Sequence, residues 1–154
     1  MLNFILFHKK KSISFFILFL SALVFYSCAS LPPSNNTFVK RYCAGKGGGF
    51  TGDYQEFSFS EDGKVYKRDF IYDRDVYYKD LSALDLAYFL QKINALGIPT
   101  AELNAPGNIS KYIEIRENET TINKLIWGAE NFYAPKDITS FFEELYQKLS
   151  ERPE

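Results

Sequence analysis

The stretch Tyr54–Tyr72, YQEFSFSEDGKVYKRDFIY, decides the fold of this chain. Apolar and polar residues alternate in its first half, and Phe57 and Phe59 share one side, as in a half-buried strand. Asp62-Gly63 is a favoured pair for a tight two-residue turn. A return strand over residues 65–72 follows the turn, so the stretch predicts an antiparallel hairpin.

Further strands are predicted on both sides of this hairpin. Residues 37–43 alternate upstream of it, and a short strand over 76–79 follows a turn downstream. Residues 110–116 and 120–127 form a second candidate hairpin, beyond an irregular crossing segment at 98–108. Because strands joined by tight turns pair antiparallel, we expect a mainly antiparallel sheet of about five to six strands.

Two segments carry the period of amphipathic helices. The first begins at a capping box formed by Ser82 and Asp85 and ends before Gly97, a residue typical of the position after a helix. The second begins at Pro135. Their apolar residues are, in order, Leu86, Phe89, Leu90, Ile93 and Leu96, then Ile138, Phe141, Phe142, Leu145, Tyr146 and Leu149. We therefore expect a two-layer α+β domain over residues 37–150, with both helices packed on one face of the sheet.

The first 27 residues have the composition of an export signal. Three consecutive lysines at 9–11 precede the apolar run Ile13–Tyr26, which is the order of a positive n-region and an apolar h-region. The run is 14 residues long. A permanent membrane-spanning helix needs about 20 residues, so residues 1–27 are predicted to be a signal peptide.

Ser27, Cys28 and Ala29 follow the apolar run and are small enough for a signal peptidase. The segment resembles the bacterial lipoprotein signal, in which such a cysteine becomes the first mature residue and receives acyl chains such as palmitate. The resemblance implies lipidation of Cys28, a tether within residues 28–36, and stable attachment of an exported protein to a membrane of the cell envelope. Two alternatives remain open: cleavage after Ala29, which releases a soluble secreted protein, and an uncleaved anchor.

The chain beyond residue 27 has no imidazole and is mildly acidic. The only histidine, His8, and the only methionine, Met1, lie in the predicted signal. Without histidine, the mature chain cannot use Ser-His or Cys-His nucleophiles or histidine-ligated metals. It carries four more acidic than basic side chains. This charge does not favour binding of nucleic acid, and no motif for a cofactor or a metal is present.

Cys43 is the second cysteine of the chain. If Cys28 carries lipid, Cys43 has no partner within the chain, and it is predicted to be a small buried strand residue. If lipidation fails, the export context would permit a disulfide between the two cysteines. At the other end of the chain, residues 151–154 are predicted to be a free tail.

The segment Gly45–Gly52, GKGGGFTG, is rich in glycine. One interpretation is a phosphate cradle, but the segment lacks the Gly-Lys-Ser/Thr ending of a P-loop and no predicted helix follows it. A second is a loop or bulge with positive φ angles and Phe50 in the core. A third is close approach of a ligand or partner backbone, which makes Gly47, Gly48, Gly49 and Phe50 the candidate binding loop.

Three motifs together resemble a recurring group of small uncharacterised bacterial lipoproteins. They are the Gly-Gly-Gly-Phe-Thr-Gly string at 47–52, the Asp-Gly hairpin at 62–63 and the Ile-Trp-Gly step at 126–128. The resemblance would span residues 38–149. It implies the type of fold and no particular activity.

We expect a non-catalytic binding module that is anchored in the envelope by lipid. Its partners would be the membrane, through the lipid, and another envelope protein, because tyrosines on an exposed sheet face favour contact. One alternative is an enzyme that acts on glycan, which needs two carboxylates about 5–9.5 Å apart in a cleft. The candidates are Asp53, Glu56, Asp73 and Asp75. Another alternative is a structural protein or secreted inhibitor that inserts the glycine segment into a partner's active site.

Overall fold

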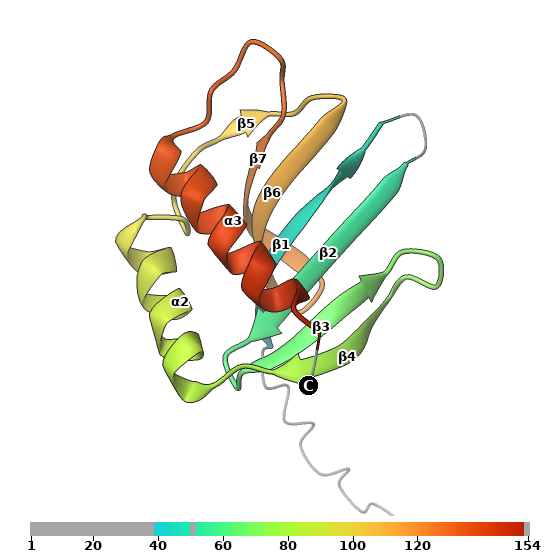
Figure 1. Cartoon of the computed structure of the whole chain (residues 1–154), viewed down its shortest axis with the longest axis vertical. Coiled ribbons are helices and arrows are strands. Elements are labelled where there is room, and N and C mark those ends of the chain that lie inside the picture. Colours follow the sequence, from blue (N-terminus) through green and yellow to red (C-terminus); the bar gives the residue numbers. More distant parts are fainter. Residues whose placement is uncertain (1–38, 50–51, 153–154) are drawn as a thin grey trace, which may run out of the picture. The chain divides into compact units, whose positions relative to one another are not determined.

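The computed structural model describes residues 39–49 and 52–152 (Figure 1). These residues belong to one compact unit. The predicted signal peptide, the lipidation site Cys28, the tether and Phe50 lie outside the described residues, so the expectations for them stay predictions.

A seven-stranded sheet forms the frame of the molecule. Its strand order is β4-β3-β2-β1-β6-β7-β5, and the strands are β1 (Lys40–Gly48), β2 (Asp53–Ser60), β3 (Lys64–Asp69), β4 (Arg74–Asp80), β5 (Asn104–Ala105), β6 (Ile109–Glu117) and β7 (Thr120–Trp127). Neighbouring strands pair antiparallel except β5 and β7. Together with two helices, this sheet confirms the predicted α+β class.

The predicted number of strands is too low because of β5. This strand lies within residues 98–108, for which the sequence predicts an irregular crossing segment, and it pairs parallel with the end of β7. The backbone N–H of Ile126 also donates to the C=O of Leu103 at 2.8 Å. The two residues of β5 lie between Pro99 and Pro106, and two residues are too few to show the apolar–polar alternation of a strand.

The central strand β1 is longer than predicted. It begins at Lys40 and continues through Gly45 to Gly48, so the loop interpretation is wrong for Gly45–Gly47. The positive φ angles that it expects are present at Gly48, Gly49 and Gly52. Gly45, for example, lies opposite Glu56 of β2 and Tyr112 of β6. Backbone pairing with both neighbours holds Gly45 and Gly47 extended despite the weak intrinsic preference of glycine for a strand.

The strand after the first hairpin turn is shorter than predicted. It ends at Asp69, whose carboxylate accepts hydrogen bonds from the backbone N–H groups of Ile71 at 3.1 Å and Tyr72 at 3.3 Å. Such bonds from an aspartate to the following backbone favour a turn over a strand. Consequently β4 begins earlier than predicted, at Arg74, and Asp75 lies in a strand instead of a solvated turn.

The helices α2 (Ala83–Ala95) and α3 (Lys136–Ser150) form where the apolar period predicts them. The Ser82 hydroxyl accepts a hydrogen bond from the backbone N–H of Asp85 at 3.1 Å, as expected at a capped N-terminus. Gly97 follows α2 with a φ of 64°, a left-handed conformation that glycine adopts without strain. Both helix predictions are confirmed.

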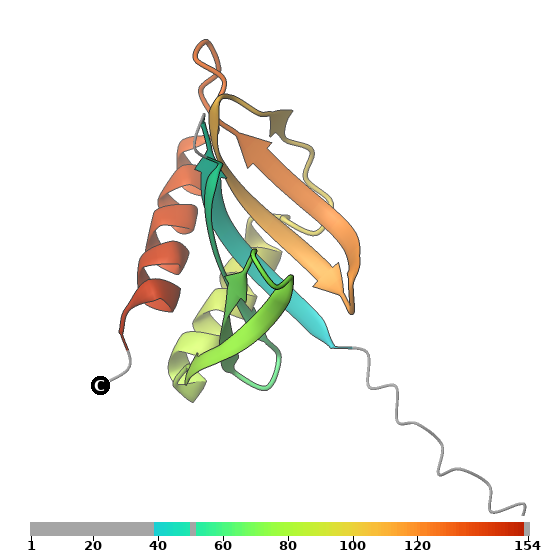
Figure 2. The same ribbon diagram turned by 90° about the vertical axis from the view of Figure 1, so that its right-hand side faces the viewer.

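Both helices cover the same face of the sheet, which we call the helix face (Figure 2). Apolar side chains from both layers are buried there, among them Tyr42, Ala44, Phe57, Phe59, Val65, Phe89, Ile93, Ile113, Ile115, Leu125, Trp127, Ile138, Phe141, Phe142, Leu145 and Leu149. Trp127 of β7 packs edge-on against Phe142 of α3, with ring centroids 5.3 Å apart. This apolar burial is the main force that holds the two layers together.

Candidate functional site

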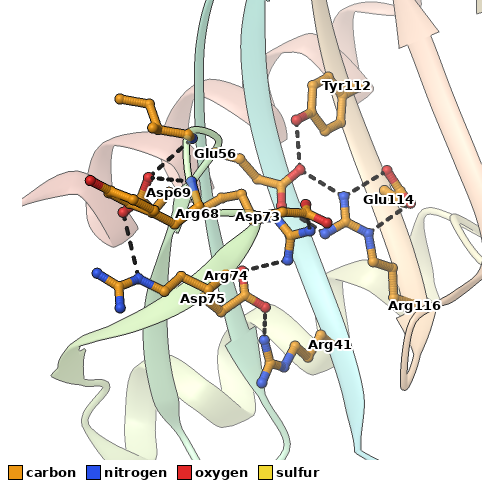
Figure 3. Close-up of polar contacts among 12 residues, drawn as sticks. Arg41, Glu56, Arg68, Asp69, Asp73, Arg74, Asp75, Tyr112, Glu114 and Arg116 are labelled. Atoms are coloured by element: carbon orange, nitrogen blue, oxygen red, sulfur yellow. Dashed lines mark hydrogen bonds and ion pairs between the residues drawn. The ribbon is translucent and has the colours of Figure 1, made fainter.

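The face of the sheet opposite the helices carries polar and charged side chains, and we call it the open face. Because side chains alternate along a strand, every second residue of the strands lies on it. These residues include Arg41, Cys43, Tyr54, Glu56, Ser58, Tyr66, Arg68, Asp75, Tyr77, Tyr112, Glu114, Arg116 and Lys124. Several of them are buried, and their contacts with one another account for this burial (Figure 3).

Glu56 of β2 lies at the centre of a polar network on the open face (Figure 3). It is only 1% exposed. The guanidinium of Arg116 donates to both of its carboxylate oxygens, each at 2.8 Å, and the hydroxyl of Tyr112 donates to one of them at 2.6 Å. Burial and the Glu56 charge raise the pKa of Tyr112 far above its ordinary value, so this phenol keeps its proton. A bidentate pair of this kind fixes both side chains in one geometry.

Gly45 makes the contact between Tyr112 and Glu56 possible. It lies between them in one cross-strand row, because it is the register partner of both. A Cβ atom at position 45 would lie 2.2 Å from the Cζ atom of the Tyr112 ring. The missing side chain therefore lets the ring cross β1 and reach the carboxylate on β2. Packing within the chain therefore explains why position 45 of the glycine segment is a glycine.

Glu114 of β6 extends the network on the other side of Arg116. It accepts hydrogen bonds from Arg116 Nε at 2.8 Å and from the Thr121 hydroxyl at 2.6 Å, and Lys124 Nζ lies 3.0 Å away. Burial alone would raise the pKa of Glu114, but these three partners outweigh it and lower the pKa to about 2. The network is complete: no buried side-chain polar atom lacks a partner in the part of the chain that the structure describes.

Cys43 lies on the open face between Ser58 of β2 and Glu114 of β6. It is fully buried, which confirms the prediction of a small buried strand residue. Burial, followed by the charge of Glu56, raises the pKa of this thiol far above its ordinary value. A neutral, buried thiol is not a nucleophile.

A second set of ion pairs bends the β3–β4 hairpin over the open face (Figure 3). Asp75 of β4 pairs with Arg41 of β1 and accepts a hydrogen bond from Arg68 of β3 at 3.3 Å. Arg68 also pairs with Asp73, and the Arg41 guanidinium lies 4.4 Å from the centroid of the Tyr66 ring. Two strands separate β1 from β4, so the contact between Arg41 and Asp75 requires the hairpin to curl inward.

The four carboxylates that could have served a glycan enzyme do not form a free pair. Glu56 is held within the network, and Asp73 and Asp75 both pair with Arg68. Asp53 lines a different cavity from Glu56. The geometry gives no support to a mechanism with two carboxylates on either side of one substrate.

Strands β2 and β3 separate toward the end of the sheet where β1 ends (Figure 1). They pair over only three residues, Phe57–Phe59 of β2, whereas β2 pairs with β1 along its whole length. We call the gap between Asp53–Glu56 of β2 and Arg68–Phe70 the split. A cavity of about 630 Å³ lies in it.

Large apolar side chains around the split are exposed to solvent. Five of them line the cavity, and we call them the hairpin patch: Tyr54, Phe70, Ile71, Val76 and Tyr77. Their exposed fractions run from 45% for Phe70 to 86% for Ile71. The rings of Tyr54 and Phe70 lie 5.7 Å apart, and both also line a second cavity. A cluster of exposed apolar side chains of this kind is typical of an interaction surface.

The second cavity, of about 450 Å³, borders part of the predicted binding loop. Gly47 and Gly48 line it, Gly49 lies in the turn after β1, and Phe50 lies outside the described residues. Gly48 has a φ of 119°, and a Cβ atom there would lie 2.3 Å from the carbonyl oxygen of Asn108. The close approach seen at Gly48 is thus one of the chain's own backbone. A ligand at this loop stays a prediction.

Sequence reasoning missed the partners of Glu56. Tyr112 and Arg116 belong to the second hairpin, where they alternate with the buried residues Ile113 and Ile115. The alternation could have placed them on one face. Their meeting with Glu56 depends on β1 lying between the two hairpins, and the strand order is not visible in the sequence.

No protein-family model matches this chain, and comparison with curated proteins finds no significant match. Within the described ranges, neither helix is long and apolar enough to cross a bilayer. Residues 39–49 and 52–152 also contain no cluster of three or more His, Cys, Asp or Glu side chains suited to a metal ion.

Proposed function

We propose that this protein is a lipid-anchored component of the bacterial cell envelope that binds another envelope protein without catalysing a reaction. The anchor is inferred from the signal pattern that ends at Cys28. The binding surface is inferred from the hairpin patch, which lies around the split on the β3–β4 side of the sheet.

The hairpin patch is the observation that carries the binding proposal. Its side chains are exposed and none belongs to the buried core cluster, so the fold does not require them. Ion pairs surround them, including those of Arg68 with Asp73 and of Arg74 with Asp69. An apolar centre with a polar rim is the usual composition of a protein interface, and tyrosine is enriched there.

The open-face network supports binding over catalysis. The carboxylates of Glu56, Glu114 and Asp75 each pair with arginine, so none is placed to transfer a proton to a substrate. Buried ion pairs contribute little net stability compared with apolar residues of similar volume. We infer that the network serves mainly to hold the strands behind the hairpin patch in one position.

The anchor is tested by mass spectrometry of the protein isolated from its own membranes. The proposal expects a mature chain that begins at an acylated Cys28, and it expects Cys28→Ser to appear in the soluble fraction. A mature chain that begins elsewhere and is soluble in the unmodified protein would contradict the anchor.

The binding surface is tested by chemical crosslinking of intact envelopes followed by purification of this protein. The double variant Phe70→Ser/Tyr77→Ser should lose the envelope protein that copurifies with the unmodified chain. Leu84→Ser is the matched control, because Leu84 is 85% exposed but lies on α2. Equal recovery of the same partner with both variants would contradict a role for the hairpin patch.

A further inference from the structure

We propose that the split takes an extended polypeptide segment of the partner, which pairs with the backbone of β2 as an added strand. The inference rests on the proposed function, because it states how a protein partner is held beside the hairpin patch.

The first observation is an interruption in the sheet. β2 pairs with β1 from Asp53 to Ser60, but among the described residues its other edge pairs with β3 only over Phe57–Phe59. The backbone N–H and C=O groups of Asp53–Glu56 that point away from β1 therefore have no strand partner in this part of the chain. An unpaired strand edge is a template for another strand.

The second observation is space beside that edge. A cavity of about 630 Å³ lies between Asp53 and Tyr54 of β2 and the end of β3. The unpaired part of β2 has a length of about 13 Å at ~3.3 Å per residue. An extended segment could enter beside Asp53 and Tyr54, which line the cavity, and pair with the edge of β2 from that end.

The third observation is that the hairpin is held in place at a distance from β2. Asp75 pairs with Arg41 on the central strand and with Arg68 on β3, and both arginines are largely buried. The β3–β4 hairpin is thus fixed by contacts across the sheet, although β3 pairs with β2 only at its beginning. The split is a built feature of the fold and not a frayed end.

The side chains around the split indicate the chemistry of the segment. The charged residues that line the cavity are two cations, Lys67 and Arg68, and two anions, Asp53 and Asp69. The exposed apolar wall is the hairpin patch. Because these positive and negative charges cancel, the cavity has no electrostatic attraction for an anionic chain. Apolar pockets along a strand select a segment in which every second side chain is apolar. The structure thus favours an uncharged segment that alternates apolar and polar residues.

The test uses random linear peptides displayed on phage and the lipidated full-length protein held in nanodiscs. An enriched peptide is synthesised, and backbone hydrogen exchange is measured with and without it. We expect enriched peptides to alternate apolar residues. Their binding should slow exchange of the amides in Asp53–Glu56 that point away from β1, and of those in Arg68–Phe70 that point away from β4, by about tenfold or more, which corresponds to at least ~1.4 kcal/mol of added protection. Enrichment should be lost with Phe70→Ser and kept with Leu84→Ser.

Three results would overturn the inference. One is an enriched peptide whose binding leaves exchange in Asp53–Glu56 unchanged, and another is a failure to enrich any peptide above the Phe70→Ser variant. The third is slow exchange, before any peptide is added, of the Asp53–Glu56 amides that point away from β1, which would mean that the chain's own residues already fill the split. If the envelope partner still depends on Phe70 and Tyr77 in crosslinking, each result removes strand addition alone. If that dependence also fails, the proposed function falls with it.

Discussion

The helix face and the open face of this sheet bury their side chains by different means. On the helix face, Phe142 and Leu145 are fully buried among apolar neighbours. On the open face, Glu56 and Glu114 are almost as buried, but among arginine, tyrosine and threonine partners. A strand residue on an uncovered face can therefore be buried when long charged side chains lie across one another.

The two faces also differ in what their burial contributes. Apolar burial stabilises the fold by about 25 cal/mol for each Å² removed from water. A buried ion pair roughly offsets the cost of taking its charges out of water. The helix face therefore holds the fold together, whereas the order of the open face fixes the positions of strands and side chains.

The largest effect is expected from removing the central cation of the open face. Arg116→Met leaves Glu56 and Glu114 buried without their shared partner, so the free energy of unfolding should fall by about 3–5 kcal/mol. Urea denaturation at neutral pH measures this. Leu145→Ala provides the comparison on the helix face, with an expected loss of about 2–5 kcal/mol. A loss below about 1 kcal/mol for Arg116→Met, as at an exposed ion pair, would show that the network is not buried in solution.

An effect of about 3 kcal/mol is expected from acid. The folded pKa of Glu114 is lowered from 4.5 to about 2. Its contribution to stability is therefore complete above pH 4.5 and is lost as the pH falls toward 2. Between these values, the unfolding free energy of the unmodified protein should fall more steeply than that of Glu114→Gln. Parallel curves for the two proteins would contradict the assigned hydrogen bonds.

A smaller effect is expected at Gly45. Gly45→Ala forces the Tyr112 ring away from β1 and should cost about 1–3 kcal/mol, as overpacking does. The same change in a Tyr112→Ala background should cost much less, because the ring that it meets is gone. Denaturation of the four proteins in this double-mutant cycle gives the coupling energy. Equal costs in both backgrounds would mean that Gly45 is required for another reason.

The smallest effect on stability is expected at the hairpin patch. Phe70→Ser/Tyr77→Ser should change the free energy of unfolding by less than about 0.5 kcal/mol for each substitution, as exposed sites do. Circular dichroism during urea denaturation checks this. A loss comparable to that of Leu145→Ala would place the hairpin patch in the core and remove it as a contact surface.

The sequence predicts the helix face well and the open face poorly. The stripe on α3 and the alternation of Phe57 and Phe59 are local patterns, so their burial could be foreseen. The extension of β1 through Gly45 could not, because it depends on pairing with two strands distant in the sequence. The contact between Glu56 and Arg116 could not be foreseen either, for the same reason. The contacts on the open face depend on pairing between strands that are distant in the sequence, and local sequence patterns do not reveal that pairing.

Crosslinking from a single side chain in living cells shows whether the hairpin patch, and not the exposed surface of α2, contacts a partner. A photo-reactive phenylalanine analogue is placed at position 70 of the full chain, and in a second strain at position 84. Phe70 is 45% exposed and Leu84 is 85% exposed, so exposure alone would favour the control. We expect an adduct with one envelope protein from position 70 and none from position 84. Adducts of equal yield from both positions, or from position 84 alone, would contradict this expectation.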